Sequence, residues 1–296
     1  MISVIIPFHN EKENLPILIP SLQQELTKMG SYQIILVDDG STDNYRESIQ
    51  HFINNETVIL IKLRKQMGKG RALNEGIDVS KGETIVFMDA DLQDDPADLP
   101  AFKEKIEKGY ELVNGIRHNR KDNAIIKLYS NLAGWFLRSF LRSPFTDINC
   151  GFKMFKKELL KDIPLYGNNF RFFPLAAYYE GYKVTEINVN NKSRIHGQSK
   201  YGISKIFIGI IDMLSAYFIY RFAEKPLHFF GSLGAICFSL GFTILVVLTY
   251  QRIFMDMLLY RRPALQYSIL LVTLGIQIIM TGILGELLVY LHKKNK

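Results

Sequence analysis

Two long uncharged runs near the end of this chain of 296 residues constrain its fold more than any other feature. Residues 229–250 and 264–285 contain no Asp, Glu, Lys or Arg. Each run is about 22 residues long, enough for an α-helix to cross the roughly 30 Å hydrocarbon core of a bilayer. The connection between them is short, so we expect a transmembrane hairpin; two buried helices of a soluble core are the alternative. Small residues along the first run offer surfaces for helix packing: Gly231, Ser232, Gly234, Ser239 and Gly241.

The charges around the hairpin predict which side of the membrane its ends occupy. The C-terminal tail, residues 292–296, is basic and favours the cytoplasm. Arg252, Arg261 and Arg262 in the connection favour the opposite orientation. The first residues read as a strand rather than as a secretory signal, and a large N-terminal domain without a signal should stay inside. We therefore expect a multi-pass protein of the cell (inner) membrane with both termini in the cytoplasm.

The segment before the hairpin, residues 203–222, is apolar around most of a helical circumference. Lys205, Gly209, Asp212 and Ser215 recur at helical spacing and form a narrow polar stripe. This pattern is typical of a helix that lies in the membrane interface, and a buried helix of the soluble core is the alternative. The expected organisation is a domain at 1–201, an interfacial helix region at 202–227, and the hairpin with its basic tail at 228–296.

Apolar strand-like runs and amphipathic helical segments alternate over the first 115 residues. The strands are expected at residues 2–8, 32–37, 57–63, 84–88 and 111–115. The helices are expected at residues 14–29, 42–54, 70–79 and 97–108. Strands and helices that alternate with short links are the signature of an α/β fold whose mostly parallel sheet is covered on both faces.

Polar and charged residues gather where these expected strands end, at residues 9–11, 38–41, 64–65 and 89–91. In parallel α/β sheets, ligands bind beyond the carboxyl ends of the strands, which lie at one edge. Acidic groups from separate strands therefore predict a ligand site at this edge, since a solvated rim has no reason to concentrate charge.

Asp89 and Asp91 follow one of these strands and are two residues apart. On an extended chain such residues point to the same side, and two carboxylates held close together repel each other unless a positive charge lies between them. Gln93 can add a neutral oxygen. Oxygen-only ligands suit Mg²⁺ or Mn²⁺, so the pattern predicts a divalent metal site, with a solvated acidic turn as the alternative.

The composition excludes some classes of partner. The formal net charge is +7, but we find no basic stripe with interleaved aromatic residues and no zinc-finger spacing, so no nucleic acid partner is expected. A basic protein with an apolar end more naturally meets an anionic membrane surface. The two cysteines, Cys150 and Cys237, form no metal-binding spacing or disulfide framework, which fits a reducing cytoplasm.

Four segments, VIIPFHNEKENL, VDDGSTD, GKGRALNEG and MDADLQDDP, occur in an order and spacing that resemble the family 2 glycosyltransferases. The closer similarity is to the polyprenyl-phosphate glycosyltransferases of the dolichol-phosphate mannose synthase type, and it extends over nearly the whole chain. The resemblance implies a Rossmann-like GT-A fold and inverting transfer of a sugar from a UDP- or GDP-linked donor to a polyprenyl phosphate. The two spans favour undecaprenyl phosphate, with dolichyl phosphate as the alternative, and their small residues suggest a homo-oligomer.

On the donor side, the resemblance assigns roles around the diphosphate of the nucleotide sugar. Asp89 and Asp91 match the D-x-D metal motif, with Gln93 as an additional metal contact. The metal, Mg²⁺ or Mn²⁺, would bridge the diphosphate and stabilise the departing nucleotide. Arg194 and Lys200 match residues that contact the same diphosphate.

The resemblance also implies a pocket for the nucleotide. Asp39 matches the position that contacts the base. The other residues expected to line this pocket are Pro7, His9, Glu11 and Val37. His9 departs from the aromatic residue often found at its position, which leaves the identity of the base open.

On the acceptor side, the segment from Arg117 onward matches a loop that grips the lipid phosphate. Arg117, Lys127 and Ser130 are the expected contacts, because an arginine fork suits a phosphate well. Asp147 matches an aspartate close to the reaction centre, where it would orient the acceptor or act as a base. Asp91, Asp147 and Arg117 form the expected catalytic set.

Two other functions are alternatives to this one. A processive polysaccharide synthase of the same fold typically carries a Q-x-x-R-W motif, which is absent because the single tryptophan, Trp135, follows Gly134. A non-catalytic membrane scaffold that only binds nucleotide has no need to keep Asp89, Asp91 and the later basic residues together.

Overall fold

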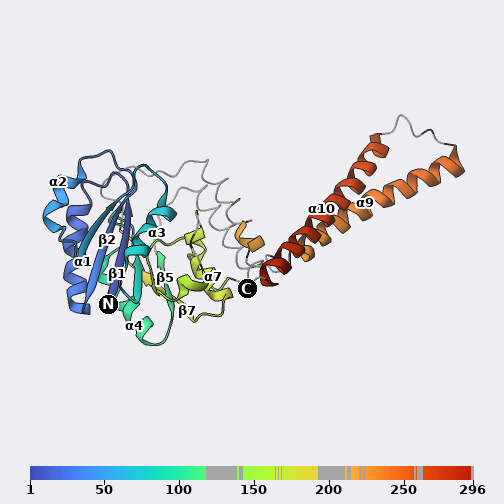
Figure 1. Ribbon diagram of the computed structural model, residues 1–296. Helices are drawn as coiled ribbons and strands as arrows, with labels where there is room; N and C mark the ends of the chain where they lie inside the picture. Colours follow the sequence, from blue (N-terminus) through green and yellow to red (C-terminus); the bar gives the residue numbers. More distant parts are fainter. Residues whose placement is uncertain are drawn as a thin grey trace. The chain divides into compact units, whose positions relative to one another are not determined.

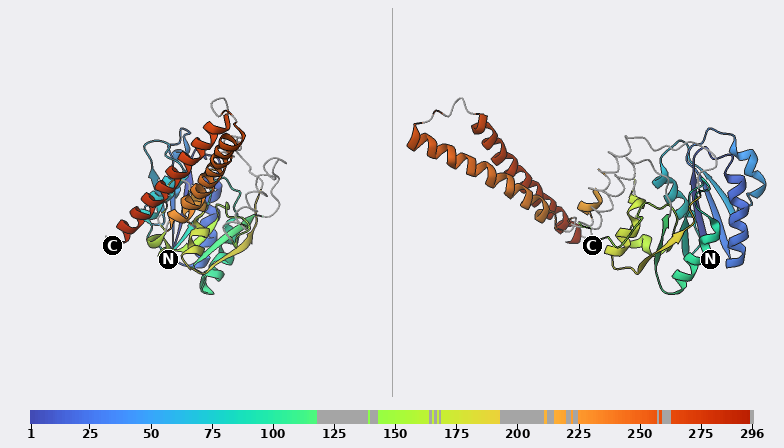
Figure 2. Two further views of the ribbon diagram at one scale, coloured as in Figure 1. Left: turned by 90° about the vertical axis from the view of Figure 1, so that its right-hand side faces the viewer. Right: turned by 180° about the vertical axis from the view of Figure 1, so that it is seen from behind.

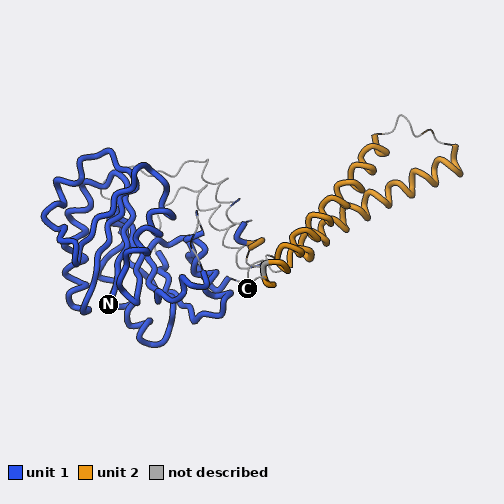
Figure 3. Tube along the Cα trace, in the orientation of Figure 1, with its two compact units in different colours: residues 1–216 blue, residues 217–296 orange. Residues whose placement is uncertain are grey.

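A computed structural model of the chain describes residues 1–117, 139, 143–163, 165, 167, 169–192, 211, 215–219, 222, 225–256, 258 and 263–294. The chain divides into two compact units, residues 1–216 and residues 217–296 (Figure 3). Most of the expected interfacial helix at 203–222 lies outside the described residues.

The first unit is built on a seven-stranded sheet (Figures 1 and 2). Its strands are β1 Ile2–Phe8, β2 Tyr32–Asp38, β3 Val58–Lys62, β4 Thr84–Phe87, β5 Leu112–Arg117, β6 Lys153–Lys156 and β7 Val184–Val189. Their order across the sheet is β3-β2-β1-β4-β6-β5-β7. Only β6 runs antiparallel to its neighbours among these strands. The predicted α/β fold with a mostly parallel sheet is confirmed.

Helices cover both faces of this sheet, which explains why its strands read as continuous apolar runs. The helical elements are α1 Leu15–Met29, α2 Tyr45–Ile49, η1 Gln50–Phe52, α3 Lys69–Val79, η2 Pro96–Asp98, α4 Leu99–Glu107, α6 Leu159–Asp162, η3 Asn169–Arg171 and α7 Phe173–Tyr179. Val4 and Ile6 join the core cluster that includes the buried side chains of α1, α2 and α4. Ile5 points the other way and contacts α3, where a Cβ added to Gly76 would meet its side chain.

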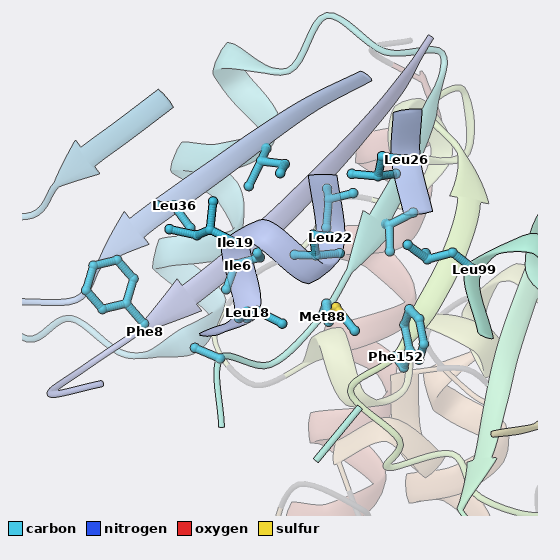
Figure 4. Packing of buried hydrophobic residues seen from close by; sticks show 14 of the residues in the cluster. Ile6, Phe8, Leu18, Ile19, Leu22, Leu26, Leu36, Met88, Leu99 and Phe152 are labelled. Carbon is cyan, nitrogen blue, oxygen red and sulfur yellow. The ribbon is translucent and has the colours of Figure 1, made fainter. Parts of the chain in front are cut away.

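Helix α1 contributes five fully buried side chains: Leu15, Leu18, Ile19, Leu22 and Leu26. They recur at helical spacing on one face of the helix and pack against strand residues such as Ile6 and Leu36 (Figure 4). Burying each of these side chains stabilises the fold by about 2 kcal/mol relative to leaving it in water. This face of α1 fixes the position of the loop between β1 and α1, which belongs to the rim of the sheet.

The helix expected at 42–54 is shorter than predicted. α2 and η1 together end at Phe52, and Asn54 then accepts hydrogen bonds through its side-chain Oδ1 from the backbone amides of residues 56–58. Asparagine competes with helical backbone bonds in this way and favours turns, so the segment becomes a turn before β3.

The second unit contains two long helices, α9 Pro226–Met255 and α10 Pro263–Lys294. Both are long and apolar enough to cross a membrane, and they include the expected spans with extra residues at each end. Many of their apolar side chains are exposed: for example, Leu240 is 57%, Ile269 51% and Leu288 68% exposed. Helices in the core of a soluble protein would bury such side chains, whereas helices in lipid need not.

Glycines mediate the packing between α9 and α10. A Cβ added to Gly234 would lie 2.6 Å from the carbonyl oxygen of Gly275, and one added to Gly275 would lie 2.6 Å from the amide nitrogen of Phe238. A Cβ on Gly241 would lie 2.7 Å from the carbonyl oxygen of Ser268. Two of the small residues that suggested an oligomer, Gly234 and Gly241, therefore serve contacts inside the hairpin, and the homo-oligomer remains a prediction.

Candidate active site

The carboxyl ends of β1, β2, β3, β4, β5 and β7 lie at one edge of the sheet, as the directions of the strand pairs require. Because β6 runs the other way, its first residue, Lys153, reaches the same edge. The side chains that follow the strand ends include His9, Asp39 and Asp89, and Arg117 closes β5. This edge is the predicted ligand rim.

The residues expected to line a nucleotide pocket come together where β1 and β2 end. Pro7 pairs with Val37 across the two strands. The Nδ1 atom of His9 lies 2.9 Å from the backbone oxygen of Asp39. Glu11 follows in the loop that leads to α1 and is partly buried. The structure thus groups all five of these residues on one part of the rim.

The two neighbouring aspartates after β2 have different partners. Asp38 is fully buried and accepts hydrogen bonds from the backbone amide of Ser41, at 2.6 Å, and from the hydroxyl of Tyr45, at 2.8 Å. The carboxylate of Asp39 accepts hydrogen bonds from the backbone amides of residues 67–68, at 2.6 to 3.1 Å. Asp38 therefore closes the turn after β2, and Asp39 orders the loop that leads into α3. The contact between Asp39 and a base remains a prediction.

Asp89 lies just beyond β4 and is surrounded by positive charge. The ammonium group of Lys69, the first residue of α3, forms an ion pair with its Oδ1 atom. Burial alone would raise the pKa of Asp89, but Lys69, with Arg117 and Lys153 further away, holds that pKa below its ordinary value. A Cβ added to Gly151 would lie 2.6 Å from the Oδ2 atom of Asp89. The carboxylate of Asp89 thus lies between the ammonium group of Lys69 and the backbone at Gly151, which has no side chain.

The chain between Asp89 and Asp91 is bent, so the extended backbone that was expected between them after the strand is wrong. β4 ends at Phe87, and Leu92 has a φ of 59°. A left-handed backbone is uncommon for a bulky residue, and such strain occurs often at functional sites. Asp91 is buried, and its Oδ1 atom accepts a hydrogen bond from the backbone amide of Gln93 at 3.2 Å.

The acidic run continues with two residues whose roles differ. Asp95 caps the next helical turn by accepting a hydrogen bond from the amide of Ala97 at 3.2 Å. Asp94 is buried instead, and the sequence analysis assigned it no role. Burial and the negative charges of Asp89 and Asp91 raise the pKa of Asp94 from 3.8 to about 7. A carboxyl group that neighbouring carboxylates keep partly protonated marks a place with excess negative charge.

The side chains of this bend suit a hard divalent cation. Among the described residues, no three His, Cys, Asp or Glu side chains gather as a metal cluster. Asp89, Asp91 and Gln93 offer oxygen atoms only, the donor set that Mg²⁺ and Mn²⁺ accept when water or a ligand phosphate completes their coordination. Burial contributes most to the raised pKa of Asp94 and the carboxylates of Asp89 and Asp91 contribute less, so the divalent metal site remains a prediction.

On the other side of the rim, Arg117 and Asp147 form a bidentate ion pair. The Nε atom of Arg117 lies 2.7 Å from Oδ2 of Asp147, and one terminal nitrogen lies 2.9 Å from Oδ1. Burial opposes the charge on Arg117, but the bonds from Asp147 raise the pKa of the guanidinium above its ordinary value. The structure thus brings together two residues of the predicted catalytic set. The remaining predicted phosphate contacts lie outside the described residues: Lys127, Ser130, Arg194 and Lys200.

Three further polar residues, Asn114, Lys153 and Glu186, lie beside this ion pair and were not predicted from the sequence. Asn114 follows two apolar residues in β5, Lys153 begins β6, and Glu186 lies in β7, which mixes polar and apolar residues. Burial lowers the pKa of the Lys153 ammonium to about 8. A buried polar residue in a strand is the signal that could have identified them, because such a group requires a partner.

The architecture of the first unit is that of the GT-A fold class. The glucosyl-3-phosphoglycerate synthase of Mycobacterium tuberculosis, whose structure was solved with Mn²⁺ and UDP-glucose, has a similar fold with a TM-score of 0.58. The two proteins share 18% sequence identity, and the similarity covers 73% of this chain and 78% of the synthase. At this level of identity, the comparison establishes the fold alone.

Sequence comparisons identify the family. The model of glycosyl transferase family 2 matches residues 3–164, and the chain belongs to this family. It is 33% identical to the dodecaprenyl-phosphate galacturonate synthase of Rhizobium johnstonii, over 97% of this chain and 87% of the relative. It is 26% identical to the undecaprenyl-phosphate 4-deoxy-4-formamido-L-arabinose transferase of Aeromonas hydrophila, with the same two coverages. The predicted resemblance to polyprenyl-phosphate glycosyltransferases, and with it the prediction of an enzyme, is confirmed.

Proposed function

We propose that this membrane glycosyltransferase transfers a sugar from a UDP- or GDP-linked donor to a polyprenyl phosphate such as undecaprenyl phosphate. One observation carries the proposal: the acidic bend around Asp89 and the Arg117–Asp147 pair share one rim, in a chain that ends in two helices able to span a membrane. An acidic group for a metal and a basic group for a phosphate match a reaction between two anions. Relatives that match 97% of this chain over 87% of their own length, named for dodecaprenyl and undecaprenyl phosphate, support the acceptor class.

The donor diphosphate would be held at the acidic bend. Asp89, Asp91 and Gln93 would hold one Mg²⁺ or Mn²⁺ ion, which supplies charge stabilisation for the departing nucleotide when it is bound. Lys69 already brings a positive charge to this place and would face the same phosphates. The Mn²⁺ and UDP-glucose found in the neighbouring synthase structure support this arrangement. Pro7, His9, Glu11, Val37 and Asp39 would line the pocket for the nucleoside, while Arg194 and Lys200 would contact the diphosphate.

The acceptor needs little activation. A phosphate monoester has its second pKa near 6, so its oxygen is already anionic at pH 7. That oxygen would form the new bond to the anomeric carbon while the bond to the nucleotide diphosphate breaks, and this single displacement inverts the configuration. Arg117 would bind the acceptor phosphate with Lys127 and Ser130. Asp147 holds the guanidinium of Arg117 in a fixed plane and would orient the acceptor, so positioning supplies most of the rate gain.

A transfer assay with the purified full-length protein tests the proposal. The assay would combine a panel of UDP- and GDP-sugars with undecaprenyl or dolichyl phosphate, in the presence of Mg²⁺ or Mn²⁺. We expect a singly glycosylated polyprenyl phosphate with inverted anomeric configuration, and a folded but inactive Asp91→Ala variant. A growing polysaccharide would favour the processive synthase, and nucleotide binding without turnover would favour the scaffold.

A further inference from the structure

Three polar residues of adjacent strands form one row beneath the candidate acceptor site. Asn114 of β5 is the direct partner of Lys153 on β6 and of Glu186 on β7. Residues paired in this way project from the same face of a sheet. Asn114 and Lys153 are buried, and Glu186 is partly buried. Burying polar groups is costly unless they are hydrogen-bonded, so the partners of this row show what it does.

The partners of Glu186 lie in the loop that carries Asp147. One carboxylate oxygen accepts a hydrogen bond from the backbone amide of Thr146 at 2.6 Å. The other accepts from the amide of Asp147 at 3.3 Å and from the side-chain amide of Asn114 at 2.9 Å. Asn114 also donates to the carbonyl oxygen of Asp147 at 2.9 Å. The backbone of Asp147 is therefore held on both sides of its Cα by side chains from β5 and β7.

Lys153 holds the rest of the same loop. Its ammonium group donates to the carbonyl oxygen of Ile148 at 3.3 Å and to that of Cys150. Gly151 follows directly and packs against the carboxylate of Asp89. The row thus orders residues 146–150. This segment connects Asp147, which contacts Arg117, with Gly151, which lies against Asp89.

We infer that Glu186 is a positioning residue, which fixes the loop so that Asp147 orients Arg117 toward the acceptor phosphate. This inference rests on the proposed function. Glu186 holds this loop through its side-chain carboxylate. The pairing of β5 with β7 is made by backbone atoms, so removing the carboxylate leaves the sheet intact. The catalytic effect of Glu186 passes through Asp147, whereas the donor pocket at β1 and β2 has no contact with it among the described residues.

Steady-state kinetics of Glu186→Ala and Glu186→Gln in the full-length enzyme test this role. A displacement of about 1 Å at a reacting group costs about 100-fold in rate, so kcat/KM for the polyprenyl phosphate should fall by about that factor in the alanine variant. Glutamine keeps one acceptor oxygen and should restore part of the loss. The KM for the nucleotide sugar should stay unchanged. Glu111→Ala is the matched control, because Glu111 accepts a backbone bond from Lys183, at 2.8 Å, at the opposite end of the same strand pair.

A double-mutant cycle with Asp147→Ala identifies the route of the effect. If Glu186 acts through Asp147, the double variant should be no slower than Asp147→Ala alone. Amide hydrogen exchange tests the loop without any turnover. The backbone amides of Thr146 and Asp147 should exchange faster in Glu186→Ala than in the wild type, and at the wild-type rate in Glu111→Ala. Additive losses in the cycle, an equal rise in donor KM, or unchanged exchange would overturn the positioning role. A wild-type enzyme that glycosylates no polyprenyl phosphate would instead overturn the proposed function, and the exchange result would still report on the loop.

Discussion

At the scale of single residues, the rim is organised by how its charges are paired. Asp89 contacts the ammonium of Lys69, and Asp147 contacts the guanidinium of Arg117. The carboxylate of Asp94 has no such cation against it among the described salt bridges and carries a raised pKa. Lys69 holds the pKa of Asp89 below its ordinary value, while Asp94 takes up a proton near neutral pH. Asp89 and Asp94 can therefore be tested by different experiments.

Gly151→Ala should impair catalysis without unfolding the protein. The added Cβ would lie 2.6 Å from Oδ2 of Asp89, so the carboxylate must move. The atom displaced is the end of a flexible side chain, and the cost to folding should be small. We expect kcat to fall by up to about 100-fold, as for other displacements of about 1 Å. Turnover together with the melting temperature checks this prediction, and a fully active variant would contradict the proposed role of Asp89.

Asp94 should make the stability of the metal-free protein depend on pH. Its pKa is about 7 in the folded state and 3.8 ordinarily, so between pH 4 and pH 7 the folded protein holds a proton that the unfolded chain has released. Stability therefore falls as the pH rises through this range, by on the order of 3 kcal/mol, and levels off above pH 7.

Asp94→Asn should remove this slope, because the amide keeps the shape of the protonated carboxyl group and does not ionise. Thermal unfolding of both proteins with a chelator between pH 4 and pH 8 measures the difference. The variant should be the more stable of the two at pH 8 and should lose that advantage toward pH 4. Parallel melting curves across this range would contradict the assignment of a raised pKa.

At the scale of elements, the sequence predicts the parts of the fold that local patterns determine. The first four strands are mostly apolar runs because helices cover both faces of the sheet. The positions of Asp39 and Asp89 on the rim follow from the rule that parallel strands end at one edge. β6 was not predicted, because it has four residues, carries a buried lysine and inserts antiparallel between strands from elsewhere in the chain. Its place depends on pairing across the sheet rather than on its own sequence.

In the candidate site too, the sequence predicts which residues take part but not which distant residues they contact. The motifs indicate which residues belong to the rim, but the ion pairs Lys69–Asp89 and Arg117–Asp147 join residues 20 and 30 positions apart. Their formation depends on how α3 and the loop 146–150 pack on the sheet. The strands of Lys153 and Glu186 were missed for a related reason, since polar residues weaken the apolar pattern that identifies a strand. Asn114 lies in a strand that was predicted, but its partners, Lys153 and Glu186, belong to strands far along the chain.

The two apolar helices depend on close contact at Gly275. A Cβ there would lie 2.6 Å from the backbone nitrogen of Phe238, which cannot move without the rest of α9. Gly275→Ala should therefore separate the helices and lower the stability of the hairpin by about 1–3 kcal/mol, as is typical of overpacking. Cysteine cross-linking between α9 and α10 in membranes measures the separation.

Gly231→Ala is the control for this prediction. A Cβ at Gly231 would contact only the side chain of Leu227 of its own helix, at 3.4 Å, which is an ordinary packing distance. Cross-linking in the control should match the wild type. Equal cross-linking in both variants would show that the hairpin tolerates a methyl group at Gly275 and that the close contact is not required.

At the scale of the whole molecule, the hairpin determines how the chain is placed in the membrane. α9 and α10 are joined by a short connection, so the chain that precedes α9 and the tail that follows α10 must lie on the same side if both helices span. The charges give conflicting indications, because the connection carries Arg261 and Arg262 while the tail carries Lys293 and Lys294. The basic tail, residues 292–296, favours the cytoplasm. We propose that the glycosyltransferase unit and the C-terminal tail are cytoplasmic, where nucleotide sugars would reach the rim directly.

Protease access to the C-terminal tail checks this topology in sealed vesicles of both orientations. The tail carries three lysines within residues 292–296, so trypsin should remove it from inside-out vesicles and leave it intact in right-side-out ones. The first unit should show the same sidedness, because both flank one hairpin. Cleavage of the tail from the periplasmic face alone, with the first unit still protected there, would mean that only one of the two helices spans. Cleavage of both from the periplasmic face would place the whole catalytic unit outside and would separate it from a cytoplasmic supply of donor.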